Sequence, residues 1–464
     1  MELHINGAGQ TVTGSEYLLV VNGKRILVDC GLYQGRNDDF EQMNRVFEFD
    51  AKTLDVVLLT HAHIDHSGNL PNLVKNGYDG PIYATAPTAD LCDVMLCDSA
   101  RIQLSDAEYA TKRALRRGEP PVLPLYTIAD AEAVYQHFRK VNYNQGVEVA
   151  PGVFATFVDA GHILGAAAII LDIHEDDRSF RMWFSGDIGR ANLPLISDPV
   201  FPFDVDYLIM EATYGDTVHA TPEQAYTELR DATLKAINKG GKIIIPAFSV
   251  GRTQELIYNF NRMMRNGEVP TLPIYVDSPL SVSTTKVFQK YANSFDSETK
   301  NFVQRYHNPA LYPPNVTYIT DVDQSKMLNN IHTQMIIISA SGMATAGRIL
   351  HHLKNNIQNP RNSVFLVSWQ SPDSLGRRLQ EGDKQVRIFG DLYELRSEVT
   401  TIHGFSAHAD KDTLLKYALS TKDSLKRLFL IHGEPDAVAP FEESLRQNGI
   451  QEIYFPKWGD VFEI

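Results

Sequence analysis

A short segment of the chain concentrates side chains that bind metal ions. The stretch LLTHAHIDHSGNL (58–70) holds His61, His63, Asp65 and His66 within six residues, directly after an apolar run. A single histidine in such a place is usually a core residue with its ring nitrogens satisfied. Several histidines this close lose hydration and repel one another when protonated, so a fold gains nothing from the cluster unless something binds it. Neutral imidazole and carboxylate are good ligands for zinc and similar divalent ions, and the segment therefore predicts a metal site.

The spacing within this segment suggests two neighbouring ions. Alternate side chains of an extended chain share a face, so His61 and His63 can reach one ion together. If the chain then turns into a helix, Asp65 and His66 point toward a second ion, and Ser-Gly-Asn at 67–69 suits that transition. The pattern differs from the helical H-E-x-x-H of metalloproteases.

Three further positions could complete the two sets of ligands. His162 in DAGHILGA, Asp187 in FSGDIG and His432 in LIHGE each follow an apolar, strand-like stretch. Each alone could be an incidental strand-end or turn residue. Together they stand at strand ends, where loops carry chemistry. Asp29 in LVDCG is either a turn cap or a carboxylate that accepts a hydrogen bond from a ligand histidine and fixes its tautomer.

These residues must be positioned by two kinds of architecture along the chain. The first half reads as short strands with interspersed helices, and the strand-rich style returns after about residue 385, with a helix near 436–447 and a last strand in EIYFP. Between them, strand, small-residue loop and helix recur as a unit, which predicts a mostly parallel sheet with helices on its faces, inserted into the first domain. The four units are GGKIIIPAFSVGRTQELIYNF, LPIYVDSPLSVSTTKVFQKY, QMIIISASGMATAGRILHHL and SVFLVSWQSPDSLGRRL.

Composition narrows the class of protein. The chain has 464 residues, enough for two or three domains, with 43% hydrophobic and 22% charged residues, as in ordinary soluble proteins. No long apolar run predicts a membrane span, and no signal peptide is evident. Three cysteines outside any C-x-x-C pair suit a reducing cytoplasm. The net charge of −14 argues against a basic surface that grips duplex DNA, although a locally positive cleft remains compatible with a nucleic-acid substrate.

The joint motif set resembles the metallo-β-lactamase superfamily and, within it, the β-CASP nucleases. HAHIDH with Asp29, His162 and Asp187 carries the first resemblance, and MEATYG, FSAHAD and IHGE are similar to the three β-CASP motifs. The resemblance implies an α/β protein, an αββα sandwich with an inserted β-CASP domain. The expected domains are residues 1–212 and 385–464 for the metallo-β-lactamase part and 213–384 for the insertion. Histidine at the third motif, His432, points to RNA, because DNA-repair members have valine there.

The resemblance also assigns roles to residues. It implies two zinc ions per chain, one bound by His61, His63 and His162, the other by Asp65, His66 and His432. Asp187 bridges the two and, with Asp65, belongs to the catalytic group. His408 of FSAHAD is the candidate proton donor to the leaving oxygen, with Glu211 of MEATYG orienting it; without the motif set, both would be read as ordinary loop and strand-end residues.

The expected activity is hydrolysis of single-stranded RNA to a 5′-phosphate and a 3′-hydroxyl by a hydroxide held at two metals. The expected phosphate contacts lie in loops that lead into helices, where backbone N–H groups favour anions, with ordinary βα-turn chemistry as the alternative. They are Ser406, Arg252, Arg348, Arg377 and Arg378. The short bacterial and archaeal relatives of the polyadenylation endonuclease resemble the chain most, although an N-terminal KH region and the C-terminal domain of ribonuclease J are not expected in it.

Two other functions stay open from the sequence. One is a small-molecule ester or thioester hydrolase of the same superfamily, but a small substrate gives no reason for the large insertion. The other is a non-catalytic scaffold subunit, but all seven ligand positions carry metal-binding residues, which argues for a working site. The sequence leaves undecided which RNA is cut, whether cutting is internal or from the 5′ end, and whether the chain forms a homodimer.

Overall fold

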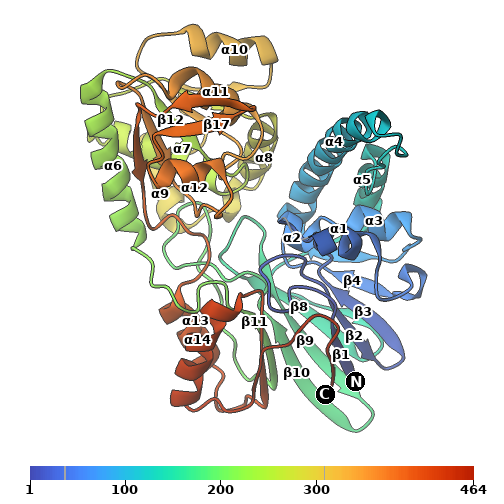
Figure 1. Cartoon of the computed structure of the whole chain (residues 1–464). Helices are drawn as coiled ribbons and strands as arrows, with labels where there is room; N and C mark the ends of the chain where they lie inside the picture. Colours follow the sequence, from blue (N-terminus) through green and yellow to red (C-terminus); the bar gives the residue numbers. More distant parts are fainter. Residues whose placement is uncertain (36–37, 308) are drawn as a thin grey trace. The chain divides into compact units, whose positions relative to one another are not determined.

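The computed structural model describes residues 1–35, 38–307 and 309–464, which form two compact units (Figure 1). Unit 1 comprises Met1–Ala191, Asp198–Val218 and His408–Ile464, and unit 2 comprises Asn192–Ser197 and His219–Ala407. The chain therefore leaves unit 1, builds unit 2 and returns. This is the inserted arrangement of an α/β metallo-β-lactamase fold that the motifs predict.

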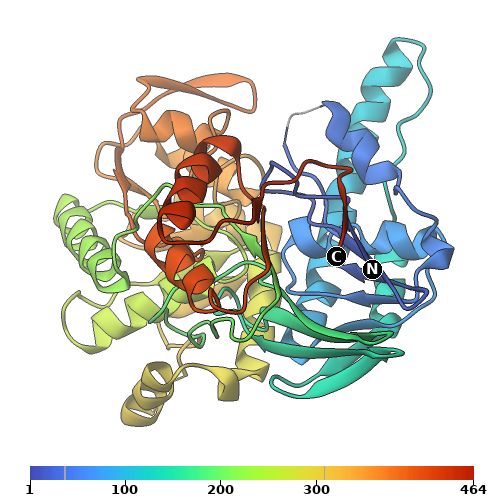
Figure 2. The same cartoon turned by 90° about the horizontal axis from the view of Figure 1, so that it is seen from below.

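Unit 1 contains two mixed sheets. The first has the order β22-β1-β2-β3-β4-β5-β6, with antiparallel pairing through β3 and parallel pairing from β3 to β6. Its strands are β1 (Glu2–Ile5), β2 (Tyr17–Val21), β3 (Lys24–Val28), β4 (Val56–Leu58), β5 (Ile82–Thr85), β6 (Phe138–Val141) and β22 (Val461–Glu463). Because β22 pairs with β1, the two chain ends lie side by side in both views (Figure 1, Figure 2).

The second sheet of unit 1 has the order β21-β20-β11-β10-β9-β8-β7. Its strands are β7 (Gly146–Ala150), β8 (Val153–Asp159), β9 (Ala167–Glu175), β10 (Arg178–Phe184), β11 (Tyr207–Glu211), β20 (Arg427–Ile431) and β21 (Ile453–Tyr454). Strands β7 to β10 are antiparallel, and β10, β11, β20 and β21 run parallel. The carboxyl ends of β10, β11 and β20 consequently meet at one edge of the sheet.

Alternating side chains create the interior of the sandwich. Along β9, Ile169 and Leu171 face a core shared with Leu3 and Leu58 of the first sheet, whereas Ile170 faces a second core with Leu414. Successive side chains of a strand point to opposite faces of the sheet, so β9 contributes apolar residues to a core on each face. The first core lies between the two sheets, and the second lies under the helices on the outer face of the second sheet.

Helices cover the outer faces of unit 1. In the described part of the chain, they are α1 (Asp38–Arg45), η1 (Ala51–Thr53), α2 (Ile64–Ser67), α3 (Leu70–Lys75), α4 (Ala86–Arg116), α5 (Ile128–Val134), η2 (Tyr135–His137), α13 (Lys411–Leu419) and α14 (Pro435–Gln447). Thr85 is the N-cap of helix α4. Its side chain accepts a hydrogen bond from the Thr88 N–H, which would otherwise have no partner in the helix.

Unit 2 is built on a parallel sheet with the order β14-β13-β15-β12-β16-β19. The strands are β12 (Ile243–Pro246), β13 (Ile274–Asp277), β14 (Val316–Ile319), β15 (Ile336–Ser339), β16 (Ser363–Leu366) and β19 (Glu398–Thr401), with a separate hairpin of β17 (Gln385–Ile388) and β18 (Asp391–Glu394). Its helices are α6 (Pro222–Lys239), α7 (Arg252–Arg265), α8 (Pro279–Lys290), η3 (Ala292–Ser294), α9 (Ser297–Tyr306), α10 (Val322–Asn330), α11 (Arg348–Asn356) and α12 (Leu375–Gln380). The four expected strand-loop-helix units are β12–α7, β13–α8, β15–α11 and β16–α12.

The compact units divide at residues other than those expected from the sequence. The chain returns to unit 1 at His408 rather than near residue 385, because β19 extends the sheet of unit 2 by pairing with β16. The segment Asn192–Ser197 also belongs to unit 2, where the Leu195 N–H donates to the Asp296 carboxylate at 2.7 Å. The strand in EIYFP is not the last, since β22 follows it.

No helix in the described ranges is both long enough and apolar enough to cross a membrane.

Glu16 provides a test of the packing behind β2 and β3. It is 7% exposed, the Cys30 thiol lies 4.0 Å from its carboxylate, and burial raises its pKa to about 8. The folded state therefore holds this proton more tightly than the unfolded chain, in which the pKa is near 4.5, so its contribution to stability is lost as the pH rises from 4.5 to about 8.

We expect Glu16→Gln to flatten this dependence and to raise the free energy of unfolding near pH 8 by an amount on the order of a few kcal/mol. Urea unfolding at several pH values measures it, with the exposed Glu108→Gln on α4 as the matched control. A variant with the same pH slope as the natural protein would contradict the assignment.

Candidate metal centre

The HAHIDH segment runs from strand into helix, as the spacing predicts. It follows β4, and α2 begins at Ile64, so that His61 lies in the loop and His66 in the helix. His61 is 0% and His66 2% exposed, which is unusual for groups that can be charged. The backbone holds the helix in place, because the Cys30 N–H donates to the His66 carbonyl at 2.8 Å.

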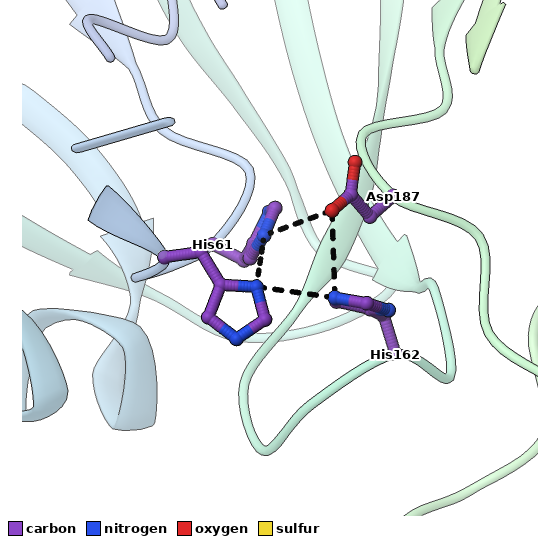
Figure 3. A group of neighbouring side chains, drawn as sticks. His61, His162 and Asp187 are labelled. Carbon is purple, nitrogen blue, oxygen red and sulfur yellow. Dashed lines mark hydrogen bonds and ion pairs between the residues drawn. The ribbon is translucent and has the colours of Figure 1, made fainter. Parts of the chain in front are cut away.

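A first group of four donors converges from three separate segments (Figure 3). His63 Nδ1 lies 3.1 Å from His61 Nε2 and 3.2 Å from His162 Nε2. Asp187 Oδ2 lies 3.4 Å from the Nε2 atoms of both His61 and His162. Figure 3 shows His61, His162 and Asp187 directed toward one point.

A second group of donors comprises Asp65, His66 and His432. His432 Nε2 lies 3.4 Å from Asp65 Oδ2, and His66 Nε2 lies 3.2 Å from Asp187 Oδ1. The two oxygens of Asp187 thus face the two groups separately, one toward His61 and His162 and the other toward His66. This carboxylate therefore lies between the two groups and faces both.

Close backbone packing sets the position of Asp187. Gly189 follows β10, and its N–H donates to the Ala160 carbonyl at 2.7 Å. A Cβ atom at Gly189 would come within 1.7 Å of the Gly161 carbonyl oxygen, so only glycine allows this approach. The contact holds the loop of Asp187 against the loop of His162.

The donor atoms fit a metal ion by their spacing and by their free lone pairs. Zinc–nitrogen bonds of about 2.0–2.1 Å in a tetrahedron separate the ligand atoms by roughly 3.3–3.4 Å. Four of the six distances among the atoms of the first group are 3.1–3.4 Å, and all six are within 4.8 Å. Within the described residues, the buried Asp187 Oδ1 accepts no hydrogen bond, which leaves its lone pairs available to a cation.

The electrostatics keep His61, His162 and Asp187 in the protonation states that ligands need. Burial lowers the pKa of His61 to about 3, with the neighbouring His66 contributing, and burial likewise lowers the pKa of His162 far below its usual range. Burial alone would raise the pKa of Asp187, but His66 and the other imidazoles outweigh it and lower that pKa well below its usual range. Neutral imidazole and ionised carboxylate bind metal ions without first losing a proton. His66 differs, because burial lowers its pKa but Asp187 and Asp29 outweigh burial and raise that pKa well above its usual range, so His66 must lose a proton to bind a metal ion.

A network of hydroxyl and carboxylate groups orients the histidines from behind. Asp29, which follows β3, accepts hydrogen bonds from the Thr60 hydroxyl at 2.8 Å and pairs with His66 Nδ1 at 2.7 Å. The Thr60 oxygen also lies 3.1 Å from His61 Nδ1, and the Thr213 hydroxyl lies 3.0 Å from His432 Nδ1. In each of these histidines the contact is made by Nδ1, which leaves Nε2 directed into the donor group. Such partners fix the orientation and the tautomer of the ring. The sequence predicts the role of Asp29 but not those of Thr60 and Thr213. Thr60 directly precedes the HAHIDH motif, and Thr213 is part of MEATYG.

A third group joins the metal centre to a candidate proton donor. Glu211 ends β11 and is fully buried, and both of its oxygens lie 3.1 Å from His408 Nδ1. The Ile188 N–H donates to Glu211 at 2.6 Å, which fixes the carboxylate. The other ring nitrogen, His408 Nε2, lies 3.8 Å from Asp187 Oδ2. Burial lowers the pKa of His408, but Glu211 and Asp187 outweigh it and raise the pKa to about 9.

The expected phosphate contacts lie in unit 2 and differ in how their side chains are engaged. Arg348 donates to Asp277 at 2.6 Å, and Arg252 is 8% exposed, pairs with Glu255 and lies over the Phe405 ring at 5.2 Å. Arg377 is 38% exposed and donates to Glu381 at 2.8 Å. Arg378 similarly donates to Asp383 at 2.8 Å, and Ser406 is partly exposed near the end of the unit. The structure therefore gives Arg348 and Arg252 internal partners, and their contact with RNA stays a prediction.

Three family descriptions match successive parts of the chain. Residues 18–178 match the metallo-beta-lactamase superfamily domain, and residues 253–379 match the Beta-Casp domain. Residues 392–456 match the Zn-dependent metallo-hydrolase RNA specificity domain. With the converging histidines and aspartates, these matches define a metal-dependent hydrolase of the nuclease type.

Known proteins share this organisation. Ribonuclease TTHA0252 of Thermus thermophilus is 32% identical over 98% of each chain, and an RNase J-like protein of Methanocaldococcus jannaschii is 31% identical over 88% of this chain and 87% of that one. The transcription termination factor FttA of Methanothermobacter thermautotrophicus is 32% identical over 90% of this chain, which spans 64% of its length. The chain belongs to the β-CASP ribonuclease family of the metallo-β-lactamase superfamily. A crystal structure of a protein of unknown function from Enterococcus faecalis, 13% identical, shares the fold with a TM-score of 0.55 over 99% of each chain.

The bridging position of Asp187 predicts a specific loss of metal. We expect Asp187→Ala to lose at least one bound ion per chain, because both donor groups share this carboxylate. Metal analysis by mass spectrometry after gel filtration measures the ratio, with Asp79→Ala, an exposed carboxylate of the same unit, as the control. Unchanged metal content in Asp187→Ala would exclude the bridging role.

Proposed function

We propose that this protein is a zinc-dependent ribonuclease that hydrolyses phosphodiester bonds of single-stranded RNA endonucleolytically, leaving a 5′-phosphate and a 3′-hydroxyl. The observation that carries the proposal is the pair of donor groups joined by Asp187, next to the His408–Glu211 pair. The names of the relatives, a ribonuclease and an RNase J-like protein, support RNA as the substrate.

The donor set assigns each ligand to one of two zinc ions. His61, His63 and His162 would hold one ion, while Asp65, His66 and His432 would hold the other, with Asp187 between them. Nitrogen-rich donor sets with few carboxylates favour zinc over magnesium or calcium, which prefer oxygen ligands. When bound, two such ions lower the pKa of water and offset negative charge on the phosphate.

His408 is suited to supply the proton that the leaving 3′-oxygen needs. Its Nδ1 is occupied by Glu211 at 3.1 Å, so Nε2 is the nitrogen directed toward the metal centre. A carboxylate at Nδ1 stabilises the imidazolium and orients it, as a general acid requires. Because His408 is 22% exposed whereas Glu211 is buried, the imidazole can meet substrate and the carboxylate cannot.

Among the proposed phosphate contacts, Arg377, Arg378 and Ser406 are the more accessible. Arg348 and Arg252 would have to exchange a carboxylate partner for phosphate. If Arg348 left Asp277, this buried carboxylate would lose its guanidinium partner and keep its contacts with His352 and Ser325, and the loss of a partner is costly for a buried charge. For these two residues, we therefore favour a role in holding the loops over direct phosphate binding.

One experiment tests the reaction itself. Single-stranded RNA labelled at the 5′ end or the 3′ end is incubated with zinc-loaded protein and followed over time. Internal cutting gives a ladder of intermediate fragments from both labels, whereas 5′-exonuclease action releases mononucleotides from the 5′ label at once. Hydrolysis of thioester or lactone substrates without RNA cleavage would overturn the proposal in favour of a small-molecule hydrolase.

The role of His408 predicts a dependence on the leaving group. His408→Ala should keep its metal while RNA cleavage falls on the order of 10²–10⁴-fold, the usual contribution of a general acid. A nitrophenolate is stable as an anion and needs no proton, so bis(p-nitrophenyl) phosphate should lose much less rate. Glu211→Gln should show the same pattern more weakly.

Steady-state rates on both substrates, with metal content for each variant, check this prediction. Equal losses on the two substrates would instead indicate phosphate binding by His408. Loss of metal from His408→Ala would make His408 a ligand and exclude the general-acid assignment.

A further inference from the structure

Two exposed aromatic side chains stand at the carboxyl edge of the parallel sheet of unit 2. Phe248 follows β12 and is 43% exposed, and Trp369 follows the neighbouring strand β16 and is 59% exposed. Large rings are normally buried, because each removes a large apolar area from water. In parallel sheets with flanking helices, this edge is the usual place for ligands.

Both rings belong to one cluster of loops. The Phe248 ring lies against Gly342, in the loop after β15, so closely that a Cβ there would be 3.0 Å from it. The side-chain N–H of Gln370, the residue after Trp369, donates to the Gly342 carbonyl at 3.2 Å. Strands β15, β12 and β16 are consecutive in the sheet, so their loops emerge side by side.

The backbone around the rings is held firmly. The Thr253 N–H and hydroxyl both donate to the Phe248 carbonyl, at 3.2 and 2.7 Å. Gln370 is 1% exposed and also donates to the Ser368 carbonyl at 2.8 Å. A fixed ring presents a preorganised surface, so little conformational entropy is lost when a ligand packs on it.

The rings differ from other exposed aromatics of the unit in having no ring partner among the described residues. Phe389, which is 53% exposed, packs on His351 with 4.6 Å between ring centres. The chain neighbours of the two rings include the polar residues Ser249, Ser368 and Gln370, and the nearest valines, Val250 and Val367, are buried. Flat apolar faces with polar surroundings match a nucleobase, which has an apolar face and a polar edge, better than they match an aliphatic protein surface.

We propose that Phe248 and Trp369 form a base-stacking site for single-stranded RNA in unit 2. The proposal rests on the proposed ribonuclease function and adds to it how the strand is held. Stacking on aromatic rings tolerates any base, and it supplies affinity without positive charge. That suits a chain with a net charge of −14, whose nearby Arg252 and Arg348 already have carboxylate partners.

Tryptophan fluorescence tests the site directly, since the chain has three tryptophans. Trp183 is fully buried and donates to Tyr417, and Trp458 is 44% exposed in unit 1. In full-length Trp458→Phe protein, phosphorothioate-linked single-stranded RNA should quench the emission saturably, because Trp369 is then the exposed tryptophan. The quenching should disappear in the double variant Trp458→Phe/Trp369→Phe.

Affinities of variants test the energetic role. Trp369→Ala and Phe248→Ala should each weaken binding of single-stranded RNA by about 10-fold to 100-fold, the usual effect of losing one stacked base. Trp369→Phe should restore most of the affinity, and Phe389→Ala should bind as the natural protein does. An oligonucleotide with abasic sites should show little difference between natural protein and Trp369→Ala. Thermal unfolding of each variant verifies the fold.

The outcomes separate this proposal from the proposed function. If the natural protein cleaves RNA but Trp369→Ala and Phe248→Ala bind RNA as tightly as Phe389→Ala does, the stacking site is wrong and the ribonuclease assignment stands. If the natural protein neither binds nor cleaves RNA, the proposed function itself fails. Absence of quenching, or equal losses on normal and abasic RNA, would overturn stacking and leave the rings as a protein contact.

Discussion

The arrangement of the two donor groups in unit 1 depends on one carboxylate, Asp187, which contacts histidines of both groups. Five imidazoles and two carboxylates crowd into one place, and without a cation such a group is costly, because the rings face one another with unshared lone pairs and the carboxylates lose hydration. The arrangement reduces that cost by directing one oxygen of Asp187 to each donor group. Strands from both sheets end near this carboxylate. Strands β4, β10, β11 and β20 deliver His61, Asp187, Glu211 and His432, and the parallel register pairs Glu211 with Ile431, immediately before His432.

Holding these groups requires backbone conformations that most residues avoid. Asp29 and His432 both have positive φ, 61° and 47°, in the left-handed region that costs a non-glycine residue on the order of 1 kcal/mol or more. The surrounding contacts compensate for this. Asp29 accepts hydrogen bonds from the N–H and the hydroxyl of Thr60, both at 2.8 Å, while Thr213 bonds both the carbonyl and the ring of His432. The strain is thus located at residues of the donor network, and the hydroxyl groups of Thr60 and Thr213 hold these residues by hydrogen bonds.

The sequence predicts the metal-binding residues of the centre better than it predicts the residues that hold them in place or the strands at the edges of the sheets. Ligand residues cluster in short motifs with unusual composition, so HAHIDH alone indicated a metal site, and the recurring strand-loop-helix units predicted the parallel sheet of unit 2. Thr60 and Thr213 escaped notice because a threonine has many ordinary uses and only its distance from a ring nitrogen gives it a role. The edge strands β19 and β22 were missed for a related reason. Both are short and poorly buried, so their pairing depends on long-range neighbours rather than on a local hydrophobic pattern. The partner of Arg348 could likewise not be predicted, because Asp277 stands 71 residues away in the sequence.

The pairing of Arg348 has a consequence for how an acidic protein can bind RNA. Asp277 is fully buried and also contacts His352 and Ser325, so Arg348 is needed where it is to neutralise that charge. With this arginine and Arg252 committed to carboxylates, electrostatic attraction at the loops of unit 2 is weak, and a net charge of −14 adds long-range repulsion of a polyanion. Under the proposed function, affinity for RNA would come from short-range contacts, namely cations held at the Asp187 centre and stacking on the exposed rings. Such contacts lose less strength with added salt than a lysine-rich surface does, because fewer counterions are released when the complex forms.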